Sequence, residues 1–578
     1  MSTEKPPSEA VEPENRETSS PTSTAAIQPH SKTPTATEEV KSAKDASAAA
    51  PSSTEEDSSI VNSPVQLALI SLAMGLAIFV TGLDFAIVST AIPVITNHFG
   101  NVTDIGWYGS AYTLTTSTCQ MIYGKLYKFF PVKWVFLGSV ALLELGSLVC
   151  ALAPNSAALI IGRAIAGCGS AGTVSGTLII VSYSVPLHLR PAYNGMIGGL
   201  ENIASVVAPL IGGVLTTYVS WRWCFYINLP IGGVTLLVIL LLFENPAAQK
   251  LSTENFKTKL IEMNLFGLGV FIGSIVCLLL ALQWGGVTYA WSSGRIVVVL
   301  VVFAVSFVLF LALEVWKRDH AVFPGRVILH PTIILSLVYG FCTSAAISVM
   351  SYYLPLWFQT IKGASAAQSG VRILPMIIGL TVIAISVGFV VSRLGYYNPF
   401  MFLGSTLMAI SAGMMTTFTN DTNHPAWIGW QAMFGMGAGF SFSQPFNAIG
   451  STLKPDDIAS GMSAAVFGNI FGSALFISVA QNVFSSTLRT RLEQHVPSVD
   501  PAAVLATGAT DLRNLFDPNT LRQVLVQYNV AVTRTFFISV GLICFHVLAA
   551  VFLPWKSMKH SQDDEDKGEE NAAAEAQI

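Results

Sequence analysis

The sequence predicts an all-α polytopic membrane protein, with two bundles of six transmembrane helices and two further helices inserted between them. An apolar composition, fourteen apolar segments and an internal repeat lead to this prediction. Of the 578 residues, 52% are hydrophobic and 11% are charged, whereas soluble domains carry roughly 25% charged residues. The formal net charge of −4 provides no basic surface for nucleic acid. We therefore exclude a soluble enzyme and a DNA-binding protein.

Each predicted span is a run of about 20 mostly apolar residues, the length that crosses a bilayer as a helix. The runs are centred near residues 78, 116, 142, 170, 206, 233, 274, 305, 345, 380, 408, 437, 472 and 541. Short loops that this count places in the cytosol hold most of the cations, and short external loops hold few. The positive-inside rule describes this asymmetry. We therefore expect both termini to lie in the cytosol.

A weak internal repeat relates the two halves of the chain. Residues 134–140 read WVFLGSV and residues 400–407 read FMFLGSTL, an offset of 266. A polar residue followed by two glycines recurs at an offset of 268: Arg163, Gly167 and Gly169 against Gln431, Gly435 and Gly437. Both matches shift the chain by eight spans and not by six, so two extra spans separate two bundles. Parallel six-helix repeats around a central cavity are typical of one large class of secondary transporters.

The composition and the repeat set the domain boundaries. Residues 1–63 are mostly small, polar or charged and cannot bury enough apolar surface to fold, so we expect a disordered cytosolic tail. The remaining regions are a first bundle (64–245), a cytosolic linker with two inserted helices (246–325), a second bundle (326–556) with an external loop near 488–527, and a cytosolic acidic tail (557–578).

Two charged residues lie deep in apolar segments of the first bundle: Asp84 in the first span and Arg163 in the fourth. A charge inside the membrane is costly and normally faces a cavity or a partner. Asp84 could hold and release a proton, or it could be an interfacial residue that caps a break in the helix. Arg163 could pair with a carboxylate and favour its charged form, or it could form a purely structural ion pair.

The fifth span combines a second carboxylate, Glu201, with small residues and a proline. The motif residues are Ala208, Pro209, Gly212 and Gly213. Small residues let helices approach closely, and a proline inside a helix removes a backbone hydrogen bond and bends it. This span is a pivot or seal between the bundles, or a helix that is only closely packed. Glu201 is either linked to protons or a hydrogen-bonded structural residue.

The sequence lacks the G-x-x-x-x-G-K-[ST] phosphate loop and any pair of cysteines in a C-x-x-C motif. Its seven cysteines fall within or at the edges of apolar segments, where cysteine acts as a small core residue. Transport would therefore draw on an ion gradient or on the substrate gradient itself. We expect neither a cofactor nor a metal ion.

At these residues the chain resembles the major facilitator superfamily, and specifically its 14-spanner drug:proton antiporter branch in fungi. The stretch 83–93, Arg163 with its two glycines and the APLIGG stretch at 208–213 are similar to motifs of that branch. The run WRWCFYINLPIGG at 221–233 looks most like the fungal toxin and multidrug efflux pumps. The resemblance covers residues 64 to 556 and implies the major facilitator fold.

The loop after the second span departs from the pattern of the family, which usually reads G-x-L-x-D-R-x-G-R-K. Here it reads GKLYKFFPVK from Gly124 to Lys133, with Lys128 in place of the usual Asp. The resemblance implies a cytosolic gating loop at Gly124, Lys128 and Lys133, but the lysine puts an acidic contact from this loop in doubt. In addition, Ala166 stands where the fourth-span motif has Gln, and alanines replace two glycines of the fifth-span motif.

The resemblance implies a proton-coupled antiporter that exports hydrophobic small molecules, such as drugs or fungal secondary metabolites, by alternating access. Asp84 and Glu201 would bind protons, and Arg163 would couple protonation to the rocking of the bundles. Since Gln431 stands at the position of Arg163 in the second half, we expect proton chemistry mainly in the first half. Aromatic and amide side chains of the second half suit a bulky substrate, or simply pack: Tyr352, Tyr353, Trp357, Phe358, Phe442, Gln444, Phe446 and Asn447.

Other readings of the sequence stay open. The same fold could serve uptake, or vacuolar transport of a basic amino acid or an iron chelate, and a transport-inactive membrane sensor is a further class. We expect a monomer in the plasma membrane, with the vacuolar membrane as the other candidate. Its partners would be the substrate, protons and the lipid bilayer, with no nucleic acid. Asn-x-Thr sequons at Asn101 and Asn420, both in predicted external loops, predict a glycoprotein.

Overall fold

The computed structural model describes residues 64–99, 105–245, 256–286, 289–317, 321–323, 325–506 and 516–555. The predicted tails, most of the predicted linker before the inserted helices, and the sequon at Asn101 lie outside these residues. The described part of the chain is helical throughout its regular structure, and its one β pairing is an isolated bridge between Gly285 and Tyr289.

The described residues of the first half form seven helices. They are α1 (Pro64–Phe99), α2 (Ile105–Phe129), α3 (Val132–Leu152), α4 (Ser156–Ser184), α5 (Arg190–Tyr218), the single turn α6 (Trp223–Tyr226) and α7 (Asn228–Leu242). Helix α1 packs on α5 and α7, α3 packs on α4 and α7, and α2 packs on α4. These contacts close a bundle in which α4 is the most buried of the candidate spans.

The second half repeats this scheme. They are α12 (Pro331–Thr360), α13 (Ala366–Arg372), α14 (Leu374–Leu394), α15 (Asn398–Met415), α16 (His424–Phe442), α17 (Gln444–Gly450), α18 (Pro455–His495), α19 (Pro501–Ala506) and α21 (Pro518–Phe552). Helix α12 packs on α18 and α21, α15 packs on α16 and α21, and α14 packs on α16. Each contact matches one of the first half, with α12 in the place of α1.

Equivalent glycines make equivalent contacts in the two halves. A Cβ on Gly167 of α4 would overlap the backbone of Tyr112 on α2, and a Cβ on Gly435 of α16 would overlap that of Met376 on α14. Gly169 and Gly437 press in the same way against the backbones of α3 and α15. Because only glycine permits such close approach of helices, these contacts support the repeat that the sequence predicts.

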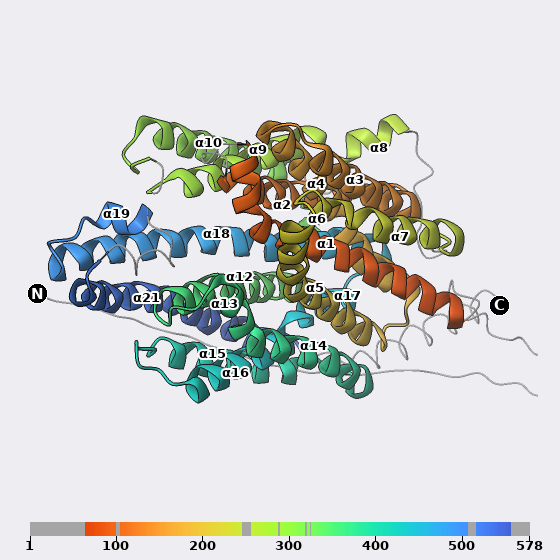
Figure 1. The fold of residues 1–578 in the computed structure, drawn as a ribbon. Helices are drawn as coiled ribbons and strands as arrows, with labels where there is room; N and C mark the ends of the chain where they lie inside the picture. Colours follow the sequence, from red (N-terminus) through yellow and green to blue (C-terminus); the bar gives the residue numbers. More distant parts are fainter. Residues whose placement is uncertain are drawn as a thin grey trace, which may run out of the picture. The chain divides into compact units, whose positions relative to one another are not determined.

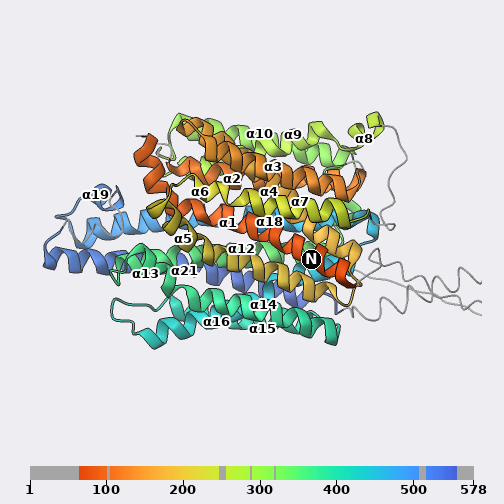
Figure 2. The same cartoon turned by 45° about the vertical axis from the view of Figure 1, so that its right-hand side comes forward.

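Among the described residues, four helices join the halves: α8 (Phe256–Glu262), α9 (Leu265–Trp284), α10 (Gly294–Lys317) and the single turn α11 (Gly325–Ile328). Helices α9 and α10 pack on each other, and α9 also contacts α2 and α18. The ring centroids of Phe271 on α9 and Phe467 on α18 are 5.3 Å apart. Figures 1 and 2 show helices α9 and α10 on the side of the bundles opposite to α15 and α16.

The fourteen predicted spans all fall in helices of the described chain. Eleven of these helices are long and apolar enough to cross a membrane. Helices α2, α15 and α16 are long enough but less apolar, because polar residues and glycines interrupt their apolar runs. Each of the three packs along a neighbouring span, so we treat them as spans too.

Candidate functional site

A central cavity of about 340 Å³ lies between the two halves. Helices α1, α2, α4 and α5 line it from one side, and α12, α18 and the α16–α17 segment line it from the other. Its walls mix apolar and aromatic side chains with hydroxyl and amide groups. A larger cavity of about 690 Å³ lies within the second half between α12, α18 and α21. The side chains that line it are apolar, so it offers no group for acid–base chemistry.

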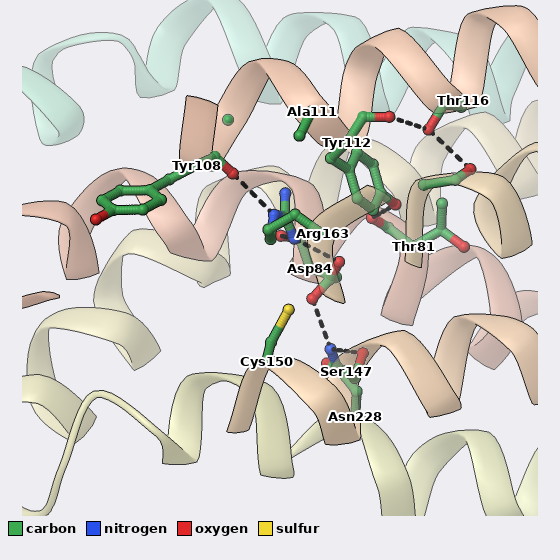
Figure 3. Close-up of polar contacts among 12 residues, drawn as sticks. Thr81, Asp84, Tyr108, Ala111, Tyr112, Thr116, Ser147, Cys150, Arg163 and Asn228 are labelled. Carbon is green, nitrogen blue, oxygen red and sulfur yellow. Dashed lines mark hydrogen bonds and ion pairs between the residues drawn. The ribbon is translucent and has the colours of Figure 1, made fainter. Parts of the chain in front are cut away.

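Asp84 and Arg163 form a buried ion pair beside the central cavity. Arg163 Nη1 donates to Asp84 Oδ2 at 2.7 Å, and both side chains are at most 1% exposed. Arg163 Nε donates to the backbone oxygen of Tyr108 at 2.9 Å, and its guanidinium carbon lies 4.3 Å from the ring centroid of Tyr112. Figure 3 shows Arg163 among these three residues. The sequence predicts a partner for Arg163 at this depth, and the structure identifies Asp84.

The second carboxylate oxygen of Asp84 is held from the opposite side by helix α7. Asn228 Nδ2 donates to Asp84 Oδ1 at 2.9 Å and to Ser147 Oγ at 3.1 Å. Both residues are fully buried. Sequence reasoning missed them, although Asn228 is a lone amide in the apolar run at 221–233 and an amide at that depth needs a polar partner.

Tyr112 separates the ion pair from the cavity. Gly82, Phe85 and Tyr112 belong to the cavity wall, whereas Asp84 and Arg163 do not. The Tyr112 hydroxyl donates to the backbone oxygen of Thr81 at 3.3 Å. The charged pair is therefore one side chain away from any molecule that occupies the cavity.

Glu201 of α5, the other predicted proton site, lines the cavity itself. Its backbone lies against α1, where a Cβ on Gly82 would be 3.1 Å from the backbone oxygen of Glu201. Glu201 and the Asp84–Arg163 pair therefore flank the same stretch of α1. They lie on different sides of Tyr112, so the structure does not bring the two carboxylates into contact.

The aromatic and amide residues predicted for a substrate cavity separate into three groups. Phe442 and Phe446 line the central cavity. Gln444 and Asn447 are buried beside it, where Asn194 Nδ2 donates to Asn447 Oδ1 at 2.9 Å. The others lie away from it: Tyr353, Trp357 and Phe358 in the core of the second half, and Tyr352 with 52% exposure at its surface.

The geometry of Trp357 shows why the aromatic residues of α12 were predicted to line the cavity but lie in the core of the second half. Its ring is fully buried and its Nε1 donates to Asn529 Oδ1 on α21 at 2.7 Å. Hydroxyl side chains of α12 face other helices as well as the cavity, for example Thr343, which bonds His546 on α21, so the pattern of polar residues does not indicate which face points to the cavity. The cavity-facing residues of α12 are Ser344, Ile347 and Ser348.

The fifth-span motif lies inside the first half, and the close contacts between the halves lie earlier in α5. Ala208 is fully buried in the cluster that joins α5 to α1, and Pro209 lies within the helix. The Gly212 carbonyl accepts from Thr216 Oγ1 at 2.7 Å, and a Cβ on Gly213 would meet nothing within 4 Å.

The seal between α5 and α14 uses glycines near the start of α5. A Cβ on Gly199 would be 2.8 Å from Ile385, and Gly195 and Gly388 approach the backbone of the opposite helix even more closely. Both Gly195 and Gly199 precede the predicted motif by at least two helical turns. The contacts lie toward the end of α5 that the sequence assigns to the cytosol.

The predicted gating loop contacts the second half through an ion pair in which the loop supplies the cation, Lys128, where the family pattern has an acidic residue. Lys128 Nζ lies 3.4 Å from Asp457 Oδ1 in the first turn of α18, and Arg326 Nη2 lies 2.9 Å from the same oxygen. We call Lys128, Arg326 and Asp457 the Asp457 latch. A Cβ on Gly124 would be 2.9 Å from the Ser463 Cβ. The Lys133 backbone donates to Asn245 Oδ1 at 3.1 Å and thus stays within the first half.

The latch belongs to a wider set of contacts between the bundles. In the described chain, the hydrogen bonds between α1–α7 and α12–α21 lie near the helix ends that the sequence places toward the cytosol. They include Tyr183 to Pro455, Arg190 to Gly450, Ala192 to Ser392 and Asn194 to Asn447. The structure is therefore closed at those ends.

The comparisons with known proteins agree with this architecture. Residues 74–477 match the family model of the Major Facilitator Superfamily. The chain is 45% identical over 506 residues to the MFS-type efflux pump MFS1 of Arthroderma benhamiae, covering 87% of this chain and 94% of the relative. It is 44% identical over 501 residues to the efflux pump aflT of Aspergillus parasiticus, covering 86% and 98%.

Solved structures share the fold at low sequence identity. The human organic anion transporter MFSD10 matches 83% of this chain and 100% of its own, with a TM-score of 0.53 and 13% identity. The proton:xylose symporter XylE matches 86% and 99%, with a TM-score of 0.53 and 14% identity. With the family model and the fungal relatives, these likenesses show that the chain is a multi-pass membrane protein and belongs to the Major Facilitator Superfamily.

Proposed function

We propose that this protein is a proton-coupled antiporter that exports hydrophobic small molecules, with fungal secondary metabolites as the first candidates. Its relatives at 44–45% identity are named efflux pumps. The observation that carries the proposal is the position of the Asp84–Arg163 pair, which is buried and one side chain away from the central cavity. A carboxylate in such a place can respond both to protons and to the occupant of the cavity.

Protonation of Asp84 would change how α1 is held against α4. The ionised carboxylate attracts Arg163, and a nearby cation favours the charged form in return. When a proton binds Asp84, this attraction is lost, while Arg163 keeps its bond to the Tyr108 carbonyl on α2. The relative energies of two bundle arrangements then differ with the protonation state, which is the requirement for coupling.

The lining of the central cavity indicates the chemistry of the substrate. Phe85, Phe442 and Phe446 offer aromatic surface from both halves, and Thr113, Ser344 and Asn469 offer a few hydrogen-bonding groups. Small-molecule sites usually combine these features for a ligand that is mostly apolar and carries some polar atoms. Glu201 is the acidic residue among the lining residues, and it would bind a proton or a polar group of the substrate.

Alternating access would require the closed end to open. The bundles 64–245 and 326–556 would rock about the central cavity, while the inserted helices in 246–325 remain at the rim. Opening breaks the Asp457 latch and the α5–α14 seal. The latch retains an ion pair at the family's gating loop, with Lys128 as the cation and Asp457 as the anion.

We further propose that the protein is a monomer of the plasma membrane with both termini in the cytosol, and that it catalyses no reaction. Glycosylation at Asn420 is compatible with its place in the connection between α15 and α16, where the residue is partly exposed. Asn101 remains a prediction from the sequence.

Purified protein in vesicles with a trapped pH dye tests this function. A panel of aromatic, mostly apolar compounds should produce compound-dependent proton movement, and Asp84→Asn should abolish it. Gly138→Ala on α3 serves as the control, because the added methyl group meets nothing within 4 Å. Substrate movement without proton flux would indicate a uniporter, and accumulation in the opposite direction would indicate uptake. A folded protein that moves neither would favour a sensor.

A further inference from the structure

Glu144 of α3 is a buried carboxyl that the proposed cycle leaves without a role. The residue is 9% exposed, and neither carboxyl oxygen has a hydrogen-bond partner in the described chain. It points at α7, where a Cβ on Gly232 would overlap the Glu144 carboxyl group. Helix α7 thus has a glycine at the position that Glu144 fills, and it contains no titratable residue along its length.

Glu144 lies one helical turn from the polar network around Asp84. Ser147 follows it by three residues on α3, and Asn228 precedes Gly232 by four residues on α7, so each pair shares a helix face. Asn228 Nδ2 contacts both Ser147 Oγ and Asp84 Oδ1. The α3–α7 interface therefore holds two polar levels, and Glu144 occupies the level nearer to the ends that the sequence assigns to the cytosol.

The surroundings of the two carboxyl groups favour different protonation states. Asp84 has Arg163 and Asn228 as partners, whereas Glu144 has neither a cation nor a hydrogen-bond donor. An ionised carboxylate without partners inside a membrane protein is strongly disfavoured, so these surroundings favour a protonated Glu144 beside a charged Asp84. Asn228, which contacts Asp84, and Gly232, which lies against Glu144, are one turn apart on α7, and neighbouring carboxyls that interact titrate as a pair.

Few other titratable groups lie near this pair. The helices that pack against α3 contribute Arg163 from α4, Cys224 from α6 and Tyr112 from α2, and α3 itself contributes Cys150. Asp84 of α1 reaches this interface through Asn228 of α7. Of these, Asp84 is the group that can accept a proton from a carboxylic acid and return it at similar energy. Glu144, Asp84 and Arg163 are all absent from the wall of the central cavity.

We propose that Glu144 is a second proton-binding site, which exchanges protons with Asp84 along the α3–α7 interface while the substrate uses the central cavity. In the transfer, the Asp84 carboxylic acid gives up its proton and re-forms the ion pair with Arg163, and the Glu144 carboxylate takes up that proton. The total charge of the pair is unchanged. The inference rests on the proposed proton coupling and adds a path for the proton that is separate from the substrate.

Two transport assays on Glu144→Gln separate this role from packing. The amide has nearly the shape of the acid but carries no exchangeable acid proton. We expect loss of proton-driven transport, while substrate–substrate exchange across the vesicle membrane persists, since exchange needs no proton transfer. Glu144→Asp keeps a titratable group and should retain part of the proton-driven transport. Proton-driven transport by Glu144→Gln at the level of the parent protein would overturn the proposal.

A pair of neighbouring glycines gives a matched second test. Gly232→Ala pushes directly on the Glu144 carboxyl, whereas a methyl group on Gly233 meets nothing within 4 Å. We expect Gly232→Ala to lose proton-driven transport and Gly233→Ala to retain it. Equal behaviour of the two variants would contradict the role of Glu144 even if Glu144→Gln does not fold.

Infrared spectroscopy separates this inference from the proposed function. A protonated carboxyl has its own carbonyl stretch, and the band of Glu144 should be lost in Glu144→Gln. If the parent protein moves substrate without protons but the band is lost, the antiport proposal fails and the proton site stands. If antiport holds and the band is unchanged by the substitution, Glu144 is not protonated and this inference fails alone.

Discussion

The two halves of the molecule share their packing and differ in their buried charge. Asn155 caps α4 by accepting from the Ala158 amide at 2.9 Å, and Asn423 caps α16 by accepting from the Ala426 amide at 3.1 Å. Both caps are separated by the same offset of 268 residues as the repeated glycines. The two halves thus share not only the arrangement of their helices but also individual capping hydrogen bonds.

Neutral groups occupy the second half where the first half has its ion pair. Gln431, at the position of Arg163, is fully buried, and neither atom of its amide has a hydrogen-bond partner in the described chain. Ten residues further along α16, a second neutral contact joins the spans, where the Tyr339 hydroxyl of α12 donates to Ser441 Oγ at 2.8 Å. The fold therefore does not need a charge at this position. This difference supports the proposal that Arg163 is retained for coupling and not for packing.

The largest expected effect comes from giving the first half the side chain of the second. Arg163→Gln leaves the Asp84 carboxylate buried without its cation, and breaking such a pair costs about 3–5 kcal/mol. We expect a lower unfolding temperature in detergent and no proton-coupled transport. In an Asp84→Asn background the same substitution should cost much less, because the two side chains interact directly. Equal costs in both backgrounds would show that the ion pair contributes little to stability.

The sequence predicts that Arg163 has a buried partner but identifies neither that partner nor the cavity, and the reason is physical. A lone charge in an apolar span must find a partner, but several buried carboxylates could serve, and the structure identifies Asp84. By contrast, Tyr353 and Trp357 lie on a helix whose hydroxyl residues face other helices as well as the cavity, so its pattern does not indicate the cavity face. The latch was hidden for another reason: Lys128 and Asp457 are 329 residues apart, and the family pattern places an acid, not a base, in the loop.

The shared packing can be tested by adding one methyl group to each half. Gly169→Ala and Gly437→Ala would each drive a Cβ into the backbone of the neighbouring helix, and overpacking of this kind costs about 1–3 kcal/mol. We expect similar losses of thermal stability for both. Gly213→Ala is the control, since its Cβ meets no atom within 4 Å. A loss confined to one half would show that the repeat is not preserved at the level of packing.

A smaller effect is expected at the Asp457 latch, where the halves meet. Its side chains are partly exposed, and ion pairs of this type contribute about 0–1 kcal/mol. Asp457→Asn should raise the fraction of molecules open at this end, measured by distances between spin labels on α2 and α18. The combination Lys128→Asp with Asp457→Lys should restore part of the closed fraction, whereas Lys133→Asp, at a side chain outside the latch, should change it little. An effect that persists at high salt would not be electrostatic.

The smallest expected effect concerns a connection that differs between the halves. Residues 219–222 join α5 to α6, whereas α18 and α21 are joined by 496–517, and Asp517 caps α21. Hydrogen bonds from Thr520 and from the Asn519 amide hold the pKa of Asp517 below its usual value. The cap therefore stabilises α21 fully above the ordinary carboxyl pKa, and this stabilisation is lost as the pH falls through the lowered one.

Hydrogen exchange can resolve this local change. On acidification, the Asn519 and Thr520 amides should lose protection relative to the Ala158 and Ala426 amides, because asparagine caps do not titrate. Asp517→Asn keeps an acceptor and removes the titration, so its protection should no longer depend on pH in this way. If all three helix starts lose protection together, the acid acts on the bundles as a whole. A loss of protection confined to the start of α21 would show that the Asp517 cap responds to pH independently of the rest of the bundle.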